Sequence, residues 1–264
     1  MMATKLTHQR DPYWAHIAPF AVFMCILAVP DLVETCGLGG DGLDSNAASH
    51  SGATSGWSVF KHRELWLYPL QTFVCFALLI FYRRNYCLKP WAGVPLGVIA
   101  GVVGIALWVL PGLLFQRYQI AFPLSEVLGM VDRSDGFDPG SELAQHPPAI
   151  VWFWMTRLLR LIVVVPIMEE VFWRSFLMRF LADSKQEFDQ AKFGQHSGVA
   201  LLVVTSLFVA AHQPVDYFGA TCFGLLAYWV TVRTKSLVAV IAMHSVANAC
   251  LAAYVVASGQ WGYL

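Results

Sequence analysis

The chain has 264 residues, of which 57% are hydrophobic and only 13% are charged, and its formal net charge at pH 7 is zero. This composition lies outside the range of ordinary soluble domains and indicates an integral membrane protein. With no net charge, the chain gives no electrostatic reason to expect a nucleic acid or an anionic partner.

The predicted elements are all helices, because the apolar segments are continuous and lack the alternation of membrane β-strands. Four of them contain no Asp, Glu, Lys or Arg and are each about long enough to cross a hydrocarbon layer of about 30 Å: residues 65–82, 90–116, 197–215 and 236–264. Three more are expected to cross it: residues 15–30, 149–168 and 217–232. Residues 172–182 either continue the segment 149–168 past a kink at Pro166 or form a separate helix. The sequence therefore predicts an all-α, polytopic transmembrane helical bundle of seven to eight helices.

The links between these segments predict the orientation of the chain. Residues 83–89 and 233–235 are basic, whereas the loop of residues 117–148 is net acidic. By the positive-inside rule the basic links face the cytoplasm. Residues 36–57, rich in Gly, Ser and Ala, are expected to form an exposed connector. The N-terminus lacks the features of a signal peptide, and we expect residues 1–264 to form a single integral membrane domain in a bacterial inner (cell) membrane.

Ionisable side chains within apolar helices are candidates for function, because an unpaired charge in lipid is costly. The stretch EEVFWR contains Glu169, Glu170 and Arg174. On a helix Glu170 and Arg174 are four residues apart with the carboxylate first, which is the favourable order for an ion pair. Glu169 lies about 100° around the helix axis. The spacing therefore predicts a structural role for Glu170 and leaves the carboxylate of Glu169 available.

Two histidines and an asparagine lie on later apolar segments. His212 ends one segment, while His244 and Asn248, four residues apart, share one face of the last. A carboxylate and a histidine can take a proton from water, and a second histidine and an asparagine can donate hydrogen bonds to an oxyanion. The set of Glu169, His212 and His244 would equally serve as zinc ligands with an open fourth position. The residues alone leave both alternatives open.

The depths of the two histidines present a difficulty for either site. On straight helices with a rise of about 1.5 Å per residue, His212 and His244 would lie near opposite ends of their spans. Their convergence requires a tilt, a kink or shifted helix ends. Pro166 and Pro214 are available for this.

The three groups of residues resemble the motifs of the CPBP family, the CAAX proteases and bacteriocin-processing enzymes also called Abi proteins. That family carries EExxxR, FxxxH and HxxxN or HxxxD in this order on successive membrane helices. The corresponding residues here are Glu169, Glu170 and Arg174, then Phe208 and His212, then His244 and Asn248. The resemblance covers residues 149–257, the expected catalytic core, and does not extend to the helices and loops of residues 1–148.

The resemblance implies an intramembrane endopeptidase that hydrolyses a peptide bond of a membrane-associated protein. By position, Glu169 and His212 would activate the water, and His244 and Asn248 would stabilise the oxyanion. Structural support would come from Glu170, Arg174 and Phe208. The family has been described both as metalloproteases and as metal-free glutamate proteases. We expect no metal cofactor, because asparagine is a poor zinc ligand and a suitable oxyanion donor.

Two other functions are alternatives. A non-catalytic membrane scaffold or bacteriocin-immunity protein of the same fold could retain these polar residues for contacts between helices. An ion or proton transporter would also use intramembrane Glu and His, but the sequence shows neither repeats nor paired broken helices. The expected partners are membrane lipid and a membrane-associated protein or peptide substrate, not a nucleic acid.

Overall fold

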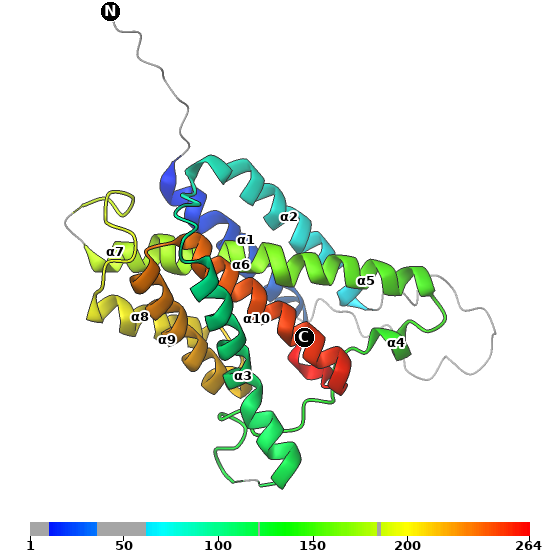
Figure 1. Ribbon diagram of the computed structural model, residues 1–264. Coiled ribbons are helices and arrows are strands. Elements are labelled where there is room, and N and C mark those ends of the chain that lie inside the picture. The colour runs from blue at the N-terminus through cyan, green and yellow to red at the C-terminus, as the bar shows by residue number, and fades with distance from the viewer. Residues whose placement is uncertain (1–10, 36–61, 121, 184–185) are drawn as a thin grey trace, which may run out of the picture.

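The computed structural model describes residues 11–35, 62–120, 122–183 and 186–264. Within these residues the chain is helical and contains no strand, which confirms the all-α prediction (Figure 1). The predicted connector at residues 36–57 lies outside the described residues. In the part that is described, six helices are long and apolar enough to cross a membrane.

The bundle is built from long helices and one broken helix. The long helices are α1 (Pro12–Thr35), α2 (Leu67–Tyr82), α3 (Val94–Tyr118), α9 (Tyr217–Thr234) and α10 (Leu237–Ser258). A continuous helical segment runs from Pro147 to Ala182 and comprises α5 (Pro147–Leu159), α6 (Val165–Glu170) and α7 (Met178–Ala182), joined by π-helical turns at Arg160–Val164 and Val171–Leu177. Residues 172–182 therefore continue the preceding helix and are not a separate span. A short helix, α4 (Pro139–Glu142), lies in the acidic loop.

Helix α8 (Gly198–Ala210) is shorter than the sequence predicted. It has 13 residues, too few to be counted among the membrane-crossing helices, whereas the apolar segment extends over residues 197–215. The helix ends because Gln213, which precedes Pro214, is extended, with φ −72° and ψ 150°, the conformation that a following proline favours. His212 consequently lies in the link between α8 and α9.

Helix α3 packs closely on α10 (Figure 1). Glycines make it possible: a methyl group on Gly97 would overlap the carbonyl oxygen of Ala239, and one on Gly101 would overlap that of Met243. Small residues at such positions allow membrane helices to approach backbone to backbone. The α10 helix, which carries His244 and Asn248, is thereby held against α3.

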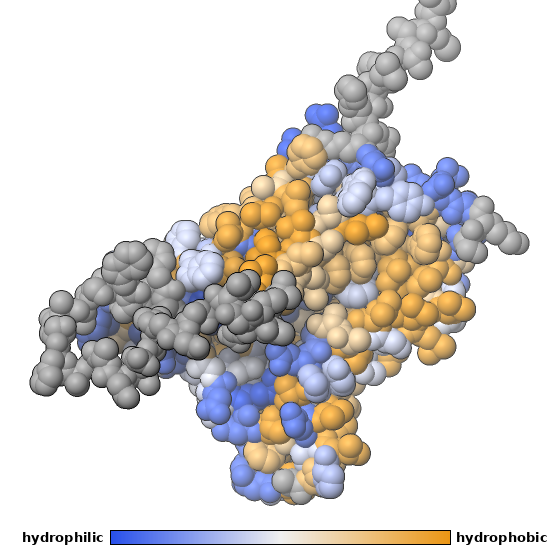
Figure 2. Space-filling model, turned by 180° about the vertical axis from the view of Figure 1, so that it is seen from behind, coloured by the Kyte–Doolittle hydropathy of each residue, from blue (hydrophilic) through white to orange (hydrophobic). Residues whose placement is uncertain are grey.

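The surface of the bundle is largely apolar. Figure 2 shows hydrophobic residues over much of one face, and large side chains such as Ile99, Met155 and Leu202 are more than half exposed. Such extended apolar exposure would be a liability in water. It is what a lipid environment requires of a membrane protein.

Candidate active site

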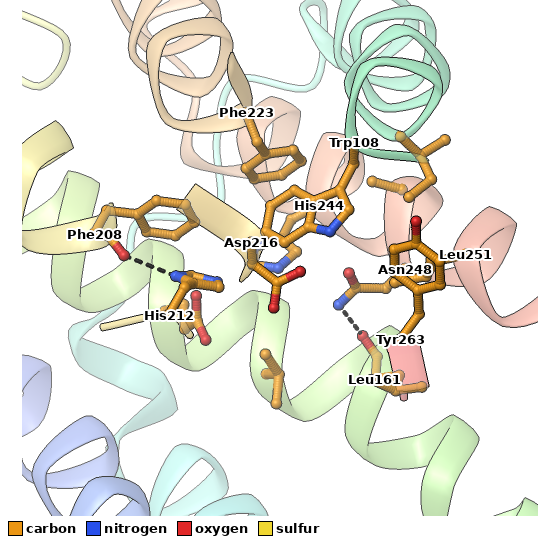
Figure 3. A pocket seen from close by; sticks show the side chains of 14 residues that line it. Trp108, Leu161, Phe208, His212, Asp216, Phe223, His244, Asn248, Leu251 and Tyr263 are labelled. Carbon is orange, nitrogen blue, oxygen red and sulfur yellow. Dashed lines mark hydrogen bonds between the residues drawn. The ribbon is translucent and has the colours of Figure 1, made fainter. Parts of the chain in front are cut away.

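A cavity of about 210 Å³ lies among the helices, and we call it the central cavity (Figure 3). Its lining includes all four residues predicted to be catalytic: Glu169 from α6, His212 from the α8–α9 link, and His244 and Asn248 from α10. The histidines therefore converge on one space despite their expected difference in depth. The early end of α8 contributes to this, because it places His212 in a link rather than near the far end of a straight span.

The remaining lining is mostly apolar and aromatic. It consists of Ile105, Trp108, Leu161, Val165, Phe208, Phe223, Ala247, Leu251, Asp216 and Tyr263. Polar groups in an apolar cavity interact more strongly with one another and with a ligand than they would in water. Sequence reasoning did not identify Asp216, which lies between two predicted spans, or Tyr263, which lies at the end of the predicted span 236–264 and carries no charge.

Glu170 is fully buried beside the central cavity and binds two partners. Its Oε2 lies 3.2 Å from Nε of Arg174, so the expected ion pair is present. Its Oε1 lies 2.8 Å from Nδ1 of His244, a contact that the sequence did not predict. Arg174 is 1% exposed, and its guanidinium lies 5.0 Å from the centre of the Phe208 ring. Glu170 thus connects Arg174 to His244, whereas Glu169 is partly exposed to the cavity.

The carboxylate of Glu170 determines how His244 can act. A carboxylate accepts hydrogen bonds, so Nδ1 of His244 carries the proton in this contact. In the neutral ring Nε2 is then an acceptor, and it can donate a hydrogen bond only when the ring is an imidazolium. An oxyanion-stabilising role for His244 therefore depends on Glu170 as well.

His212 is oriented by a backbone carbonyl. Its Nδ1 lies 2.7 Å from the carbonyl oxygen of Phe208 (Figure 3). The carbonyl can only accept, so Nδ1 carries the proton and Nε2 has a free lone pair. The ring is also held by Trp108 and Phe208, with ring centroids 5.5 and 4.6 Å away. This arrangement suits His212 to accept a proton from water.

Asn248 is positioned by a defect in the long helix. Its Nδ2 donates to the carbonyl oxygen of Leu161 at 2.8 Å (Figure 3). That oxygen lacks a helical donor, because the N–H of Val165 bonds to Arg160 in the π-helical turn and Pro166 has no N–H. The orphaned carbonyl therefore fixes the carboxamide, which keeps one N–H available. Pro166 thus contributes directly to the site.

Among the described residues no set of three or more His, Cys, Asp or Glu side chains is arranged so that it could hold a metal ion. Glu169, His212 and His244 line the same cavity without meeting this condition.

The fold and the cavity define a polytopic membrane protein with a polar site enclosed among its helices. Residues 151–250 match the family model described as type II CAAX prenyl endopeptidase Rce1-like. The chain therefore contains an Rce1-like domain of the CPBP family in this range, as the motifs predicted. The match contains all three motifs and implies CAAX-type intramembrane protease activity. Neither the curated proteins nor the solved structures contain a match to the chain.

Proposed function

We propose that the chain is an intramembrane endopeptidase in which Glu169 and His212 activate a water molecule while His244 and Asn248 stabilise the oxyanion. The observation that carries the proposal is the convergence of these four side chains, from three separate elements, on the central cavity. They include an acceptor nitrogen on His212 and a remaining N–H on Asn248. Water activation and oxyanion stabilisation need these two kinds of group.

In the proposed reaction a water molecule lies between Glu169 and His212 and attacks the carbonyl carbon of the scissile peptide. One of these two residues takes the proton as the C–O bond forms. The tetrahedral oxyanion receives hydrogen bonds from Asn248 and from Nε2 of His244 in its protonated form, while Glu170 accepts the hydrogen bond from Nδ1 of the same ring. The C–N bond then breaks, and the proton is passed to the leaving amine. The products are a carboxylic acid and an amine, so the atoms of one water molecule are consumed.

We propose that this reaction uses no metal ion. The support is the donor set, in which Asn248 is a poor ligand and the three remaining groups are not arranged as a metal-binding site. Dialysis of the purified protein against a chelator should then leave the cleavage rate unchanged. Loss of activity that returns on adding zinc would contradict the metal-free mechanism, while leaving the endopeptidase assignment intact.

The substrate that best fits the site is a membrane-associated peptide that bears an apolar group close to the scissile bond. The lining of the cavity is mainly apolar and aromatic, and the matched family is described by its prenylated CAAX substrates. An S-prenylated CAAX peptide is therefore the first substrate to test, with the unprenylated peptide as its comparison. Cleavage of only the unprenylated peptide would contradict this part of the proposal.

Glu169→Gln tests the proposed function most directly. It retains the shape of the side chain but removes the base, and general bases typically contribute at least about a hundredfold to the rate. We expect a loss of that size in the detergent-purified protein. The matched control is Glu126→Gln, an exposed carboxylate of the acidic loop. If Glu169→Gln cleaves the peptide like the wild type, or if the wild type cleaves none, the non-catalytic scaffold becomes the better account.

A further inference from the structure

Arg133, from the acidic loop, connects three segments that are distant in the sequence. It is 7% exposed. Its Nη2 donates to Oδ1 of Asp216 at 2.6 Å and to the carbonyl oxygen of Val215 at 3.0 Å, both in the α8–α9 link. Its Nη1 donates to the carbonyl oxygen of Gly262 at 3.2 Å, after the end of α10. A single buried guanidinium thus joins the loop, the link and the C-terminal segment.

Further contacts attach the C-terminal segment to the same residue. The N–H of Arg133 donates to Oε1 of Gln260 at 3.0 Å, and its carbonyl oxygen accepts from the N–H of Gly262 at 2.8 Å. The guanidinium also lies 4.5 Å from the centre of the Tyr263 ring. Burial raises the pKa of the Tyr263 phenol to about 12, so this side chain stays neutral at physiological pH. These contacts hold Tyr263 in place.

The residues held by Arg133 include two that line the central cavity, Asp216 and Tyr263. In Figure 3 the Asp216 carboxylate lies between His212 and Asn248. Only Oδ1 of Asp216 is used by Arg133, and within the described chain Oδ2 has no hydrogen bond. Because Arg133 balances its charge, Asp216 presents the cavity with a hydrogen-bond acceptor rather than with an unpaired negative charge.

A bound peptide would bring donors that need such an acceptor. The proposed reaction uses Glu169 and His212 for the water, and it uses His244 and Asn248 as donors to the oxyanion. All four are therefore engaged in the reaction itself, although Oδ1 of Asn248 and the second carboxylate oxygen of Glu169 can also accept a hydrogen bond. A peptide N–H that is buried in an apolar cavity without an acceptor loses its hydrogen bond to water and gains none in return, which weakens binding. Asp216 is the remaining carboxylate in the lining.

We infer that Oδ2 of Asp216 binds an N–H donor of the substrate beside the scissile bond, and that Arg133 is the positioning residue that holds Asp216 for this purpose. This inference rests on the proposed function and names a substrate-binding residue of the same site. The group that binds Asp216 is an N–H donor of the substrate, which can belong either to a main-chain amide or to a basic side chain. The geometry favours the main-chain amide, because the Asp216–Arg133 pair is already neutral.

The test measures binding, so that it is independent of cleavage. A fluorescently labelled S-prenylated CAAX peptide is titrated with the detergent-purified wild type, Asp216→Ala and Asp216→Asn, and its anisotropy gives the dissociation constant. We expect the constant to rise about tenfold in Asp216→Ala, and less in Asp216→Asn, which keeps an acceptor oxygen. The control Asp135→Ala, an exposed residue of the same loop, should bind like the wild type.

A set of modified peptides identifies the donor. Methylation of the contacted amide nitrogen should weaken binding to the wild type about tenfold and have no further effect in Asp216→Ala, because both changes remove one hydrogen bond. A second peptide carries norleucine in place of a lysine. If this replacement, rather than methylation, weakens binding to the wild type but has no further effect in Asp216→Ala, the donor is the lysine side chain and Asp216 still binds it. Additive effects throughout, or no binding of the peptide to the wild type, would overturn the inference. Additive effects leave the comparison of Glu169→Gln with the wild type untouched, and that comparison decides the proposed function; absent binding to the wild type would count against both.

Variants of Arg133 test the positioning role separately. Arg133→Met should abolish the sensitivity to methylation of the contacted amide, as Asp216→Ala does, and Arg133→Lys should restore part of it. A purely structural role would lower thermal stability and leave that sensitivity intact. An unchanged methylation effect in folded Arg133→Met would therefore refute the positioning role.

Discussion

Glu170 and His244 are separated by 74 positions in the chain, yet Oε1 of Glu170 lies 2.8 Å from Nδ1 of His244. The adjacent carboxylate, Glu169, faces the central cavity instead. The two neighbouring glutamates therefore have different contacts: Glu170 holds the ring of His244, and Glu169 is available to a ligand. This difference underlies the first two predictions.

Glu170→Gln should slow cleavage while leaving the cavity intact. The amide keeps the size of the side chain but replaces the carboxylate that holds Nδ1 of His244 by a neutral, weaker acceptor. Groups that orient a metal-ligating histidine are typically worth about 10- to 100-fold in metal affinity or activity, and we expect a fall in kcat of similar size here. Because Arg174 would lose its partner, the double variant Glu170→Gln with Arg174→Met serves as the control for stability. Wild-type kcat in the folded double variant would show that Glu170 serves packing alone.

Arg174→Ala should destabilise the protein strongly. It leaves the carboxylate of Glu170 buried without its ion-pair partner, and breaking a buried pair from one side costs about 3–5 kcal/mol. Unfolding in detergent with increasing denaturant measures the change. The matched control is Arg63→Ala, whose pair with Glu64 is exposed and should contribute less than about 1 kcal/mol. Equal stabilities of the two variants would argue against a bracing role for Arg174.

Pro166→Ala should reduce activity more than stability. An alanine supplies the N–H that the proline lacks, so the carbonyl of Leu161 gains a helical donor and no longer requires Asn248. The carboxamide is then less well positioned, and loss of an oxyanion donor lowers kcat by up to about 10²–10³-fold. Pro147→Ala, at the exposed first turn of α5, is the control and should be neutral. If Pro166→Ala has the kcat of the wild type, the position of Asn248 does not depend on the unpaired carbonyl of Leu161.

Gly97→Ala should separate α3 from α10. The added methyl group overlaps the carbonyl oxygen of Ala239, which is backbone and cannot move alone. Overpacking of this kind typically costs about 1–3 kcal/mol. Gly198→Ala, where a methyl group meets nothing within 4 Å, is the matched control and should not lower the melting temperature. If both variants have the melting temperature of the wild type, the close approach of α3 and α10 is not important for stability.

Local features of the chain were the predictable ones. The apolar segments predicted the helices, and the four-residue spacing of Glu170 and Arg174 predicted their ion pair, because both depend on short stretches of sequence. The contact of Glu170 with His244 joins distant helices, and no local pattern encodes it.

Two further features were missed for related reasons. Asn248 binds Leu161 because a carbonyl 87 positions away lacks a donor, and Asp216 reaches the cavity because Arg133 holds it there. The sequence placed the end of α8 too far along the chain. The apolar segment continues to residue 215, whereas the backbone becomes extended at Gln213, before Pro214. Hydropathy indicates which segments are apolar, but backbone hydrogen bonding determines where a helix stops.

The shortness of α8 has a consequence for the supply of water. Thirteen helical residues extend about 20 Å, whereas the hydrocarbon layer is about 30 Å thick. A bilayer adapts to a short apolar element by thinning locally. We expect the headgroup layer to dip toward the end of α8, which brings hydrated lipid close to His212. Hydrolysis within the membrane would then require only a short path from the aqueous phase, provided by the lipid itself.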